Sequence, residues 1–130
     1  MSSIWWEETV AVPADIAWDS LRRVDLAHEL FAPVLVDGRI SGDVRTVTFA
    51  NGLVVRERIV DVDEARRRIS YTVLDGVFEH HSASIQIVPI DAKSCRFVWI
   101  TDFLPAEKSD MVKPLVEQGS KAIARNIERR

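Results

Sequence analysis

The stretch LPAEKSDMVKPLVEQGSKAIARNIERR, residues 104–130, determines how the rest of the chain must be arranged. From Ser109 onwards its pattern changes to the 3.6-residue period of an amphipathic helix. The apolar face of this helix comprises Met111, Leu115, Ala122, Ile123 and Ile127. Such a face must be buried against another part of the chain, and nearly every earlier segment alternates with the period of a β-strand. We therefore expect a curved antiparallel sheet that wraps around one long C-terminal helix.

Two residues within this predicted helix are unusual. Gly119 lies on or near the apolar face, where alanine would stabilise the helix by roughly 0.5–1 kcal/mol. The glycine could leave space for a ligand, or it could let the sheet approach the helix closely, and both interpretations remain open. Pro114 lacks a backbone N–H and should start or kink the helix.

The composition is that of an ordinary globular protein. Of the 130 residues, 47% are apolar and 28% are charged, which suits one domain with a sizeable core. A net charge of −3 argues against nucleic acid as a partner. The single cysteine, Cys95, excludes an internal disulfide and fits a reducing compartment. Since we find neither a signal peptide nor an apolar run of membrane-spanning length, we expect a cytoplasmic protein with no membrane span.

The remaining segments predict strands with one helical interruption. Residues 3–12 predict a first strand, Pro13 the start of a short helix, and residues 26–32 a second helix that ends at Pro33. Six further strands are predicted at residues 34–41, 44–50, 53–62, 67–74, 79–90 and 95–103. Turn dipeptides separate several of them, namely Gly42-Asp43, Asn51-Gly52 and Asp75-Gly76. The predicted fold class is α+β, with about seven strands in the order β-αα-ββββββ-α.

This order resembles that of a known superfamily. The resemblance is carried by the order and spacing of Pro13-Ala14 with Trp18, Gly42-x-x-Arg45, Glu57-Arg58-Ile59 with Asp63-Glu64, Arg68-Ile69-Ser70-Tyr71, and Trp99 followed by Phe103 and Pro105. It resembles the START-related helix-grip superfamily, which includes polyketide cyclase/dehydrase-like proteins, birch pollen allergen relatives and plant abscisic acid receptors. The resemblance covers essentially the whole chain. It implies one helix-grip domain over residues 1–130, with a deep apolar cavity for hydrophobic molecules between sheet and helix.

The similarity to the abscisic acid receptors is closest at Asn51-Gly52-Leu53, which resembles their gate turn. The resemblance implies that Glu57 and Tyr71 line the cavity and that the last helix contributes Met111, Leu115 and Gly119. The segment after the gate is shorter here, the gate proline is absent, and the receptors' hormone-binding basic residue corresponds to a position near Glu29. Abscisic acid is therefore not the expected ligand.

Strand alternation supplies the other inward positions, because residues two apart share one face of a sheet. Together, the resemblance and the alternation predict a ligand-binding cavity lined by Phe49, Leu53, Glu57, Ile59, Tyr71, His81, Ala83, Ile85, Phe97, Trp99, Met111, Leu115 and Gly119.

Three of these residues are candidates for chemistry. Glu57 shares a face with apolar neighbours, so it is either a general acid, general base or ligand anchor in the cavity, or a solvent-facing residue paired with an arginine of the next strand. His81 is either a proton carrier near neutral pH or a plain hydrogen-bonded residue. Tyr71 is either core filler or a group that orients a bound oxygen. No ligand spacing for a metal is found, and no cofactor is expected.

Three functions fit this pattern. The first is a binding module, a carrier or sensor of a small hydrophobic molecule. The second is a cyclase or dehydratase that uses Glu57, His81 or Tyr71 as acid–base groups. The third is a filled core whose surface near Trp5 and Trp6 makes a homodimer contact.

Overall fold

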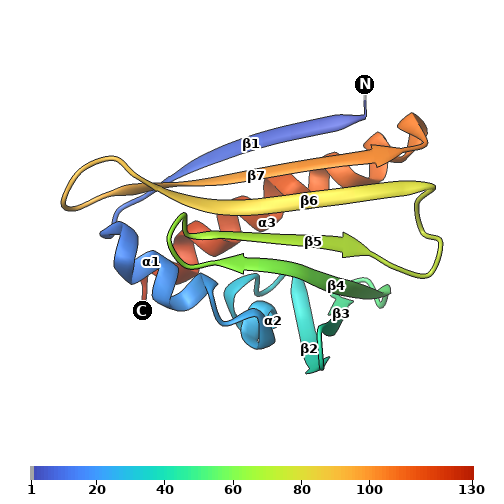
Figure 1. Cartoon of the computed structure of the whole chain (residues 1–130), viewed down its shortest axis with the longest axis horizontal. Helices are drawn as coiled ribbons and strands as arrows, with labels where there is room; N and C mark the ends of the chain where they lie inside the picture. The colour runs from blue at the N-terminus through green and yellow to red at the C-terminus, as the bar shows by residue number, and fades with distance from the viewer. Residues whose placement is uncertain (1) are drawn as a thin grey trace.

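A computed structural model describes residues 2–130 and confirms the predicted α+β helix-grip architecture (Figure 1). The strands are β1 (Ser3–Val10), β2 (Leu35–Ser41), β3 (Val44–Phe49), β4 (Val54–Asp63), β5 (Arg68–Val73), β6 (His80–Pro89) and β7 (Cys95–Leu104). The helices are α1 (Ala14–Leu21), α2 (Ala27–Leu30) and α3 (Ser109–Glu128), with short 3-10 turns η1 (Val24–Leu26) and η2 (Ala106–Lys108). The predicted element boundaries agree with these to within a few residues.

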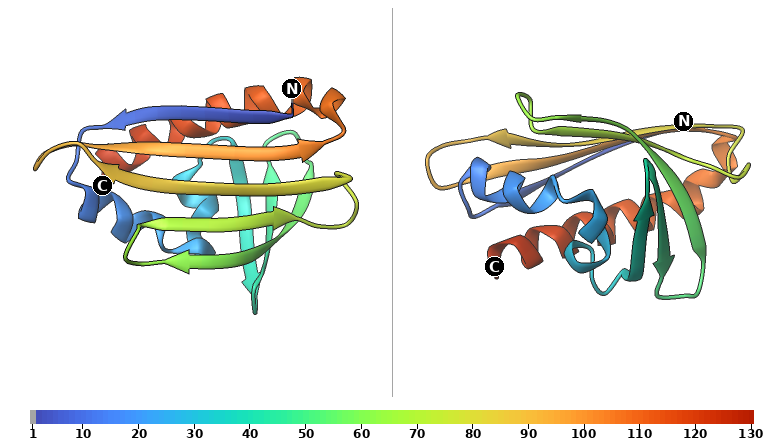
Figure 2. Two further views of the ribbon diagram at one scale, coloured as in Figure 1. Left: turned by 45° about the horizontal axis from the view of Figure 1, so that its top comes forward. Right: turned by 60° about the horizontal axis from the view of Figure 1, so that its bottom comes forward.

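The seven strands form one antiparallel sheet in the order β1-β7-β6-β5-β4-β3-β2. From β2 to β7 each strand pairs with its neighbour in the chain, and β1 closes the far edge against β7. The sheet bends strongly, so that β2 and β3 turn down beside α3 while the other strands pass over it (Figure 2, right). This curvature gives the sheet a concave face that encloses the helix on two sides.

Tight turns connect the strands at the predicted dipeptides. Gly52 has a φ of 92° in the β3–β4 turn, a backbone conformation that only glycine adopts without strain. The amide of Leu53 donates to Asn51 Oδ1 at 3.0 Å, and the amide of Phe49 donates to the Leu53 carbonyl at 2.8 Å. These bonds fix the position of the turn at the end of β3.

Helix α3 buries a face that is rotated relative to the predicted one. Ala122, Ile123 and Ile127 are buried as expected, whereas Met111 is 38% exposed and Leu115 is half-buried. The N-terminal half instead buries Val112 and Val116. The helix also runs through Pro114 from a start at Ser109, so the proline does not mark its beginning.

Helices α1 and α2 fill one end of the concave face. Apolar side chains of both helices, including Trp18 and Leu30, pack with Ile87 of β6 and Phe97 of β7 in the main core cluster. The Trp18 indole N–H donates to Glu64 at 2.9 Å, which ties α1 to the turn after β4. Since the core is solid at this end, any space for a ligand must lie toward the N-terminal half of α3.

A candidate ligand cavity between the sheet and helix α3

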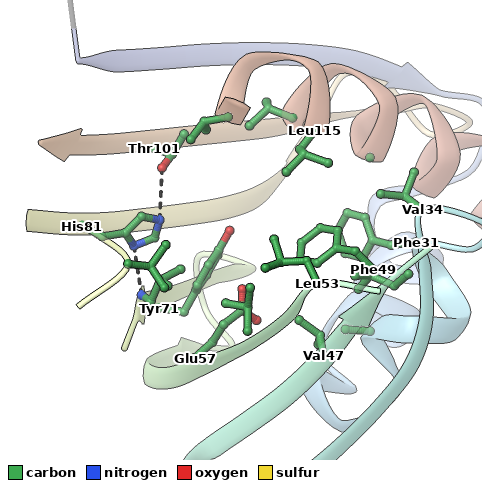
Figure 3. A pocket seen from close by; sticks show the side chains of 18 of the residues that line it. Phe31, Val34, Val47, Phe49, Leu53, Glu57, Tyr71, His81, Thr101 and Leu115 are labelled. Atoms are coloured by element: carbon green, nitrogen blue, oxygen red, sulfur yellow. Dashed lines mark hydrogen bonds between the residues drawn. The ribbon is translucent and has the colours of Figure 1, made fainter. Parts of the chain in front are cut away.

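A cavity of about 120 Å³ lies between the concave face of the sheet and the N-terminal half of α3 (Figure 3). Its walls come from α2 and the loop after it, from β2 to β7, from the β3–β4 turn, from the β5–β6 loop and from α3. The lining residues are Ala27, Phe31, Val34, Leu35, Arg45, Val47, Phe49, Leu53, Val55, Glu57, Tyr71, Val73, Val77, Phe78, His81, Ile85, Trp99, Thr101, Met111, Val112, Leu115, Val116 and Gly119. Most of these side chains are apolar. The space between the sheet and the helix is therefore an open cavity with mostly apolar walls.

The mouth of the cavity lies between the β3–β4 turn and α3. Leu53 on the turn and Met111 on the helix both line the cavity and are 41% and 38% exposed. Leu115, Val34 and Phe49 also line a second, more open pocket beside the mouth, to which Asn51 and Gln118 contribute. Figure 3 shows Leu53 and Leu115 reaching toward the same space from the turn and from the helix. Exposed apolar groups at this rim favour the passage of an apolar molecule.

A buried ion pair forms part of the cavity wall. Arg45 of β3 and Glu57 of β4 are direct cross-strand partners and are 7% and 8% exposed. Arg45 donates from Nε to Glu57 Oε1 at 2.9 Å, its Nη2 lies 2.8 Å from the same oxygen, and its Nη1 donates to the Val24 carbonyl at 3.1 Å. The guanidinium thus has a partner for each nitrogen, which stabilises a charge that burial alone would strongly disfavour.

The second carboxylate oxygen of Glu57 faces the cavity. Both contacts from Arg45 go to Oε1, and Oε2 receives no hydrogen bond from residues 2–130. The fully buried side-chain atoms that lack a partner in this part of the chain are His28 Nδ1, Trp99 Nε1 and Ser120 Oγ. Glu57 Oε2 is not among them, and Glu57 is one of the residues that line the cavity. It is therefore a free acceptor for a bound molecule.

Tyr71 places a neutral hydroxyl beside this carboxylate. Burial raises the pKa of Tyr71 far above its ordinary value of 10.0, and the charge of Glu57 raises it further. The charge of Arg45 and the neighbouring Trp99 indole act in the opposite direction and lower that pKa, although Trp99 Nε1 has no hydrogen-bond partner within residues 2–130. Figure 3 shows the Tyr71 hydroxyl and the Glu57 carboxylate directed into the same region of the cavity.

His81 is held neutral at the other side of Tyr71. Its Nδ1 accepts a hydrogen bond from the Val73 amide at 3.0 Å, so the proton of the neutral ring resides on Nε2, 3.4 Å from Thr101 Oγ1. Burial lowers the pKa of His81 to about 4, with a smaller contribution from His80. Of the two alternatives for His81, the plain hydrogen-bonded residue is therefore favoured, since desolvation disfavours the charged ring.

Aromatic rings form the wall next to α3. The Trp99 ring lies 5.5 Å from that of Phe31 and 6.2 Å from that of Phe97 between centroids. A Cβ at Gly119 would lie 3.0 Å from Trp99 Cζ3 and 3.4 Å from Phe31 Cδ1. Gly119 therefore allows the helix to approach the Trp99 ring closely, as the second interpretation expected, and it is also part of the cavity lining.

The structure contains no evident metal centre among residues 2–130, where no three His, Cys, Asp or Glu side chains gather closely enough to bind an ion. Across the same described range, no helix combines the length and the apolar character needed to cross a membrane.

The family profile described as "Polyketide cyclase / dehydrase and lipid transport" matches residues 5–130. The chain belongs to this family. Among curated proteins, none matches the sequence. This family is the one that the sequence resemblance indicated. The match therefore confirms that the chain is a member of the START-related helix-grip superfamily.

Solved structures of similar fold extend this result. A protein from Thermobifida fusca, solved by solution NMR, is 26% identical with a TM-score of 0.81. The match covers 99% of the present chain and 95% of the Thermobifida protein. Zhui aromatase/cyclase from a Streptomyces species is 24% identical with a TM-score of 0.80. The match covers 97% of the present chain and 90% of the cyclase. Norcoclaurine synthase from Thalictrum flavum, in complex with dopamine and hydroxybenzaldehyde, is 21% identical with a TM-score of 0.76. The match covers 98% of the present chain and 87% of the synthase. The latter two show the shared fold alone.

Most of the residues predicted from sequence lie in the cavity of this family member. Its lining includes Phe49, Leu53, Glu57, Tyr71, His81, Ile85, Trp99, Met111, Leu115 and Gly119. Three predicted residues lie elsewhere. Phe97 is fully buried in the core behind Trp99, and Ile59 is partly buried and packs against the same core. Ala83 pairs with Tyr71 and Thr101, and its methyl group is too short to reach past these larger neighbours.

Several lining residues were not predicted. The most important is Arg45, which alternates with Val47 and Phe49 on the inner face of β3. This alternation is visible in the sequence and could have identified Arg45 as the partner of Glu57. The two alternatives considered for Glu57 are thus combined, because the carboxylate pairs with an arginine of the next strand inside the cavity. Phe31 and Phe78 come from segments without regular alternation, which give no such signal.

Proposed function

We propose that this protein binds a small hydrophobic molecule in the cavity, as a carrier or sensor. The observation that supports this best is a largely apolar cavity with few polar side chains, among which the Arg45–Glu57 pair and His81 are held by contacts of their own. The family description, which names lipid transport beside cyclase and dehydrase chemistry, is consistent with such a role.

The state of the polar groups favours binding over proton transfer at neutral pH. His81 uses Nδ1 to accept from the backbone, and its pKa of about 4 keeps the ring uncharged. Tyr71 retains its proton because its pKa is raised by burial. A general acid or base works best when its pKa lies near the working pH, and these two residues are far from it.

A cyclase or dehydratase activity is the second candidate, and one observation favours it. Glu57 Oε2 is an unoccupied carboxylate oxygen near the Tyr71 hydroxyl in a mostly apolar cavity. Such a pair could accept a proton from carbon or oxygen of a bound substrate and donate a hydrogen bond to the charge that develops. Zhui aromatase/cyclase and norcoclaurine synthase have the same fold.

Binding can be tested by NMR through the indole N–H of Trp99, which lies at the cavity wall. Titration with toluene should shift this resonance, which a Trp99→Phe variant assigns. The Leu115→Phe change at the mouth should weaken toluene binding at least tenfold. Lys113→Phe is the matched control, because Lys113 is exposed on the same helix and does not line the cavity. Native mass spectrometry of protein from its own host should reveal a bound small molecule. An absence of any ligand in both measurements would contradict the proposal.

Catalysis is distinguished from binding by a Glu57→Gln variant. A carrier should still bind its copurified ligand after this change, whereas an enzyme should lose turnover of that compound. Release of a chemically altered product by the unmodified protein would favour the second candidate.

A further inference from the structure

The electrostatics of the cavity limit the ligand that it can hold. Two lining residues carry a full charge, Arg45 and Glu57, and their charges cancel within one ion pair. His81 and Tyr71 are both uncharged at neutral pH, since burial lowers the pKa of the first and raises that of the second. A charged ligand would therefore enter a low-dielectric space without a counter-charge to neutralise it, which is strongly unfavourable.

The free hydrogen-bonding groups limit the ligand further. Glu57 Oε2 can only accept a hydrogen bond, whereas the Tyr71 hydroxyl can donate one. Tyr71 lines the cavity and its hydroxyl is directed into it (Figure 3), so the hydroxyl proton can turn toward a bound molecule. A single neutral hydroxyl group on a ligand satisfies both, because it can donate to Glu57 and accept from Tyr71 at the same time.

The volume sets the size of the apolar part. The cavity holds about 120 Å³, on the order of the roughly 150 Å³ engineered apolar cavity that admits benzene in another protein. The rings of Phe31, Tyr71 and Trp99 line this space and provide flat apolar surfaces. One six-membered ring fits between them, whereas a fused polycycle or a long acyl chain would require the mouth to widen.

We infer that the cavity selects uncharged, single-ring molecules that carry a hydroxyl group, with that hydroxyl bound between Glu57 Oε2 and the Tyr71 hydroxyl. This inference rests on the proposed function of the same cavity and adds the chemical class of the ligand. It excludes carboxylates, including fatty acids, and it excludes ammonium compounds.

Four probes of similar size test the inference at pH 7, namely p-cresol, toluene, benzoate and benzylammonium. Their dissociation constants are measured with the intact chain by following the Trp99 indole resonance. We expect p-cresol to bind roughly tenfold more tightly than toluene, because hydrogen bonds to a charged acceptor are stronger than neutral ones. Both ions should bind at least tenfold more weakly than toluene.

Variants of Tyr71 and Glu57 then test whether these two residues cause the selectivity. Tyr71→Phe leaves the ion pair intact and should reduce the advantage of p-cresol over toluene several-fold. Glu57→Gln leaves Arg45 without its counter-charge and should increase the affinity for benzoate relative to toluene. If Glu57→Gln fails to fold, the Tyr71→Phe comparison still decides the matter, since an unchanged preference for p-cresol would overturn the inference.

The outcomes separate this inference from the proposed function. Toluene binding as tightly as p-cresol, or benzoate binding as tightly as toluene, would overturn the selectivity and leave the binding function intact. No binding of any of the four probes would overturn both.

Discussion

Helix α3 passes Trp99 so closely at Gly119 that a Cβ there would lie 3.0 Å from Trp99 Cζ3. The Gly119→Ala change should therefore alter the free energy of unfolding by less than about 1 kcal/mol, because the helix gains roughly 0.5–1 kcal/mol and the ring must shift by a few tenths of an ångström. Chemical denaturation gives the free energy, and the Trp99 indole resonance reports the shift. An unchanged resonance would show that the ring does not need to move to accept the methyl group.

The Arg45–Glu57 pair should behave as one unit in a double-mutant cycle. Arg45→Met alone should destabilise the fold by about 3–5 kcal/mol, because it leaves a buried carboxylate without a counter-charge. Combining it with Glu57→Leu should recover most of this loss, since two apolar side chains of similar size suit the surrounding wall. Urea denaturation of the four proteins measures the coupling. Additive effects of the two changes would contradict the close pairing.

The neutral state of His81 predicts a pH dependence of stability. Its folded-state pKa of about 4 lies below the ordinary value of 6.5, so between these values the unfolded chain binds more protons than the folded one. Stability should therefore fall as the pH drops from about 6.5 to about 4. After allowance for the partial exposure of the ring, this contribution is about 2 kcal/mol.

His81→Asn should flatten that pH dependence, because asparagine can accept from the Val73 amide and does not titrate. The exposed neighbour His80 provides the control, and His80→Asn should retain the slope. Thermal denaturation between pH 4.5 and pH 7 makes the comparison. The lowered pKa values of surface carboxylates such as Asp63 and Asp75 act below this window and do not interfere. An equal slope in all three proteins would exclude His81 as its source.

Ser120 should be replaceable with a gain in stability. Its side chain is 0% exposed and its Oγ has no hydrogen-bond partner among residues 2–130. Removal of a buried hydroxyl without a partner should raise the free energy of unfolding by about 1 kcal/mol in Ser120→Ala. Gln118→Ala, at an exposed position of the same helix, controls for helix propensity. A destabilised Ser120→Ala protein would imply that the hydroxyl has a partner after all.

Alternation in the sequence identifies the inner face of each strand reliably, but it does not give depth along the strand. Glu57, Tyr71 and Trp99 line the cavity, whereas Ile59 and Phe97, which were predicted on the same inner faces, do not: Phe97 is buried in the main core and Ile59 packs against it. Depth depends on where α1 and α2 fill the concave face, and the strand pattern contains no information on that.

The phase of α3 was predicted less well for a related reason. A helix that lies under a bent sheet is enclosed on two sides, so apolar residues from a wide arc are partly covered. Met111 and Leu115 belong to the edge of that arc at the mouth, whereas Val112 and Val116 lie at its centre. A count of apolar residues at helical spacing does not separate edge from centre when valine, leucine and methionine occur on neighbouring positions.

The pairing of β1 with β7 has a consequence for the order of assembly. Ser3 and Asp102 are partners in the ladder although they are 99 positions apart in the sequence. During synthesis on the ribosome, β1 emerges long before the strand that it needs, and its tryptophan-rich segment must wait unpaired until β7 is available. Because contacts between distant residues form slowly, closure of this edge is a late event, and it is the step at which a nascent chain most needs protection from association with other chains.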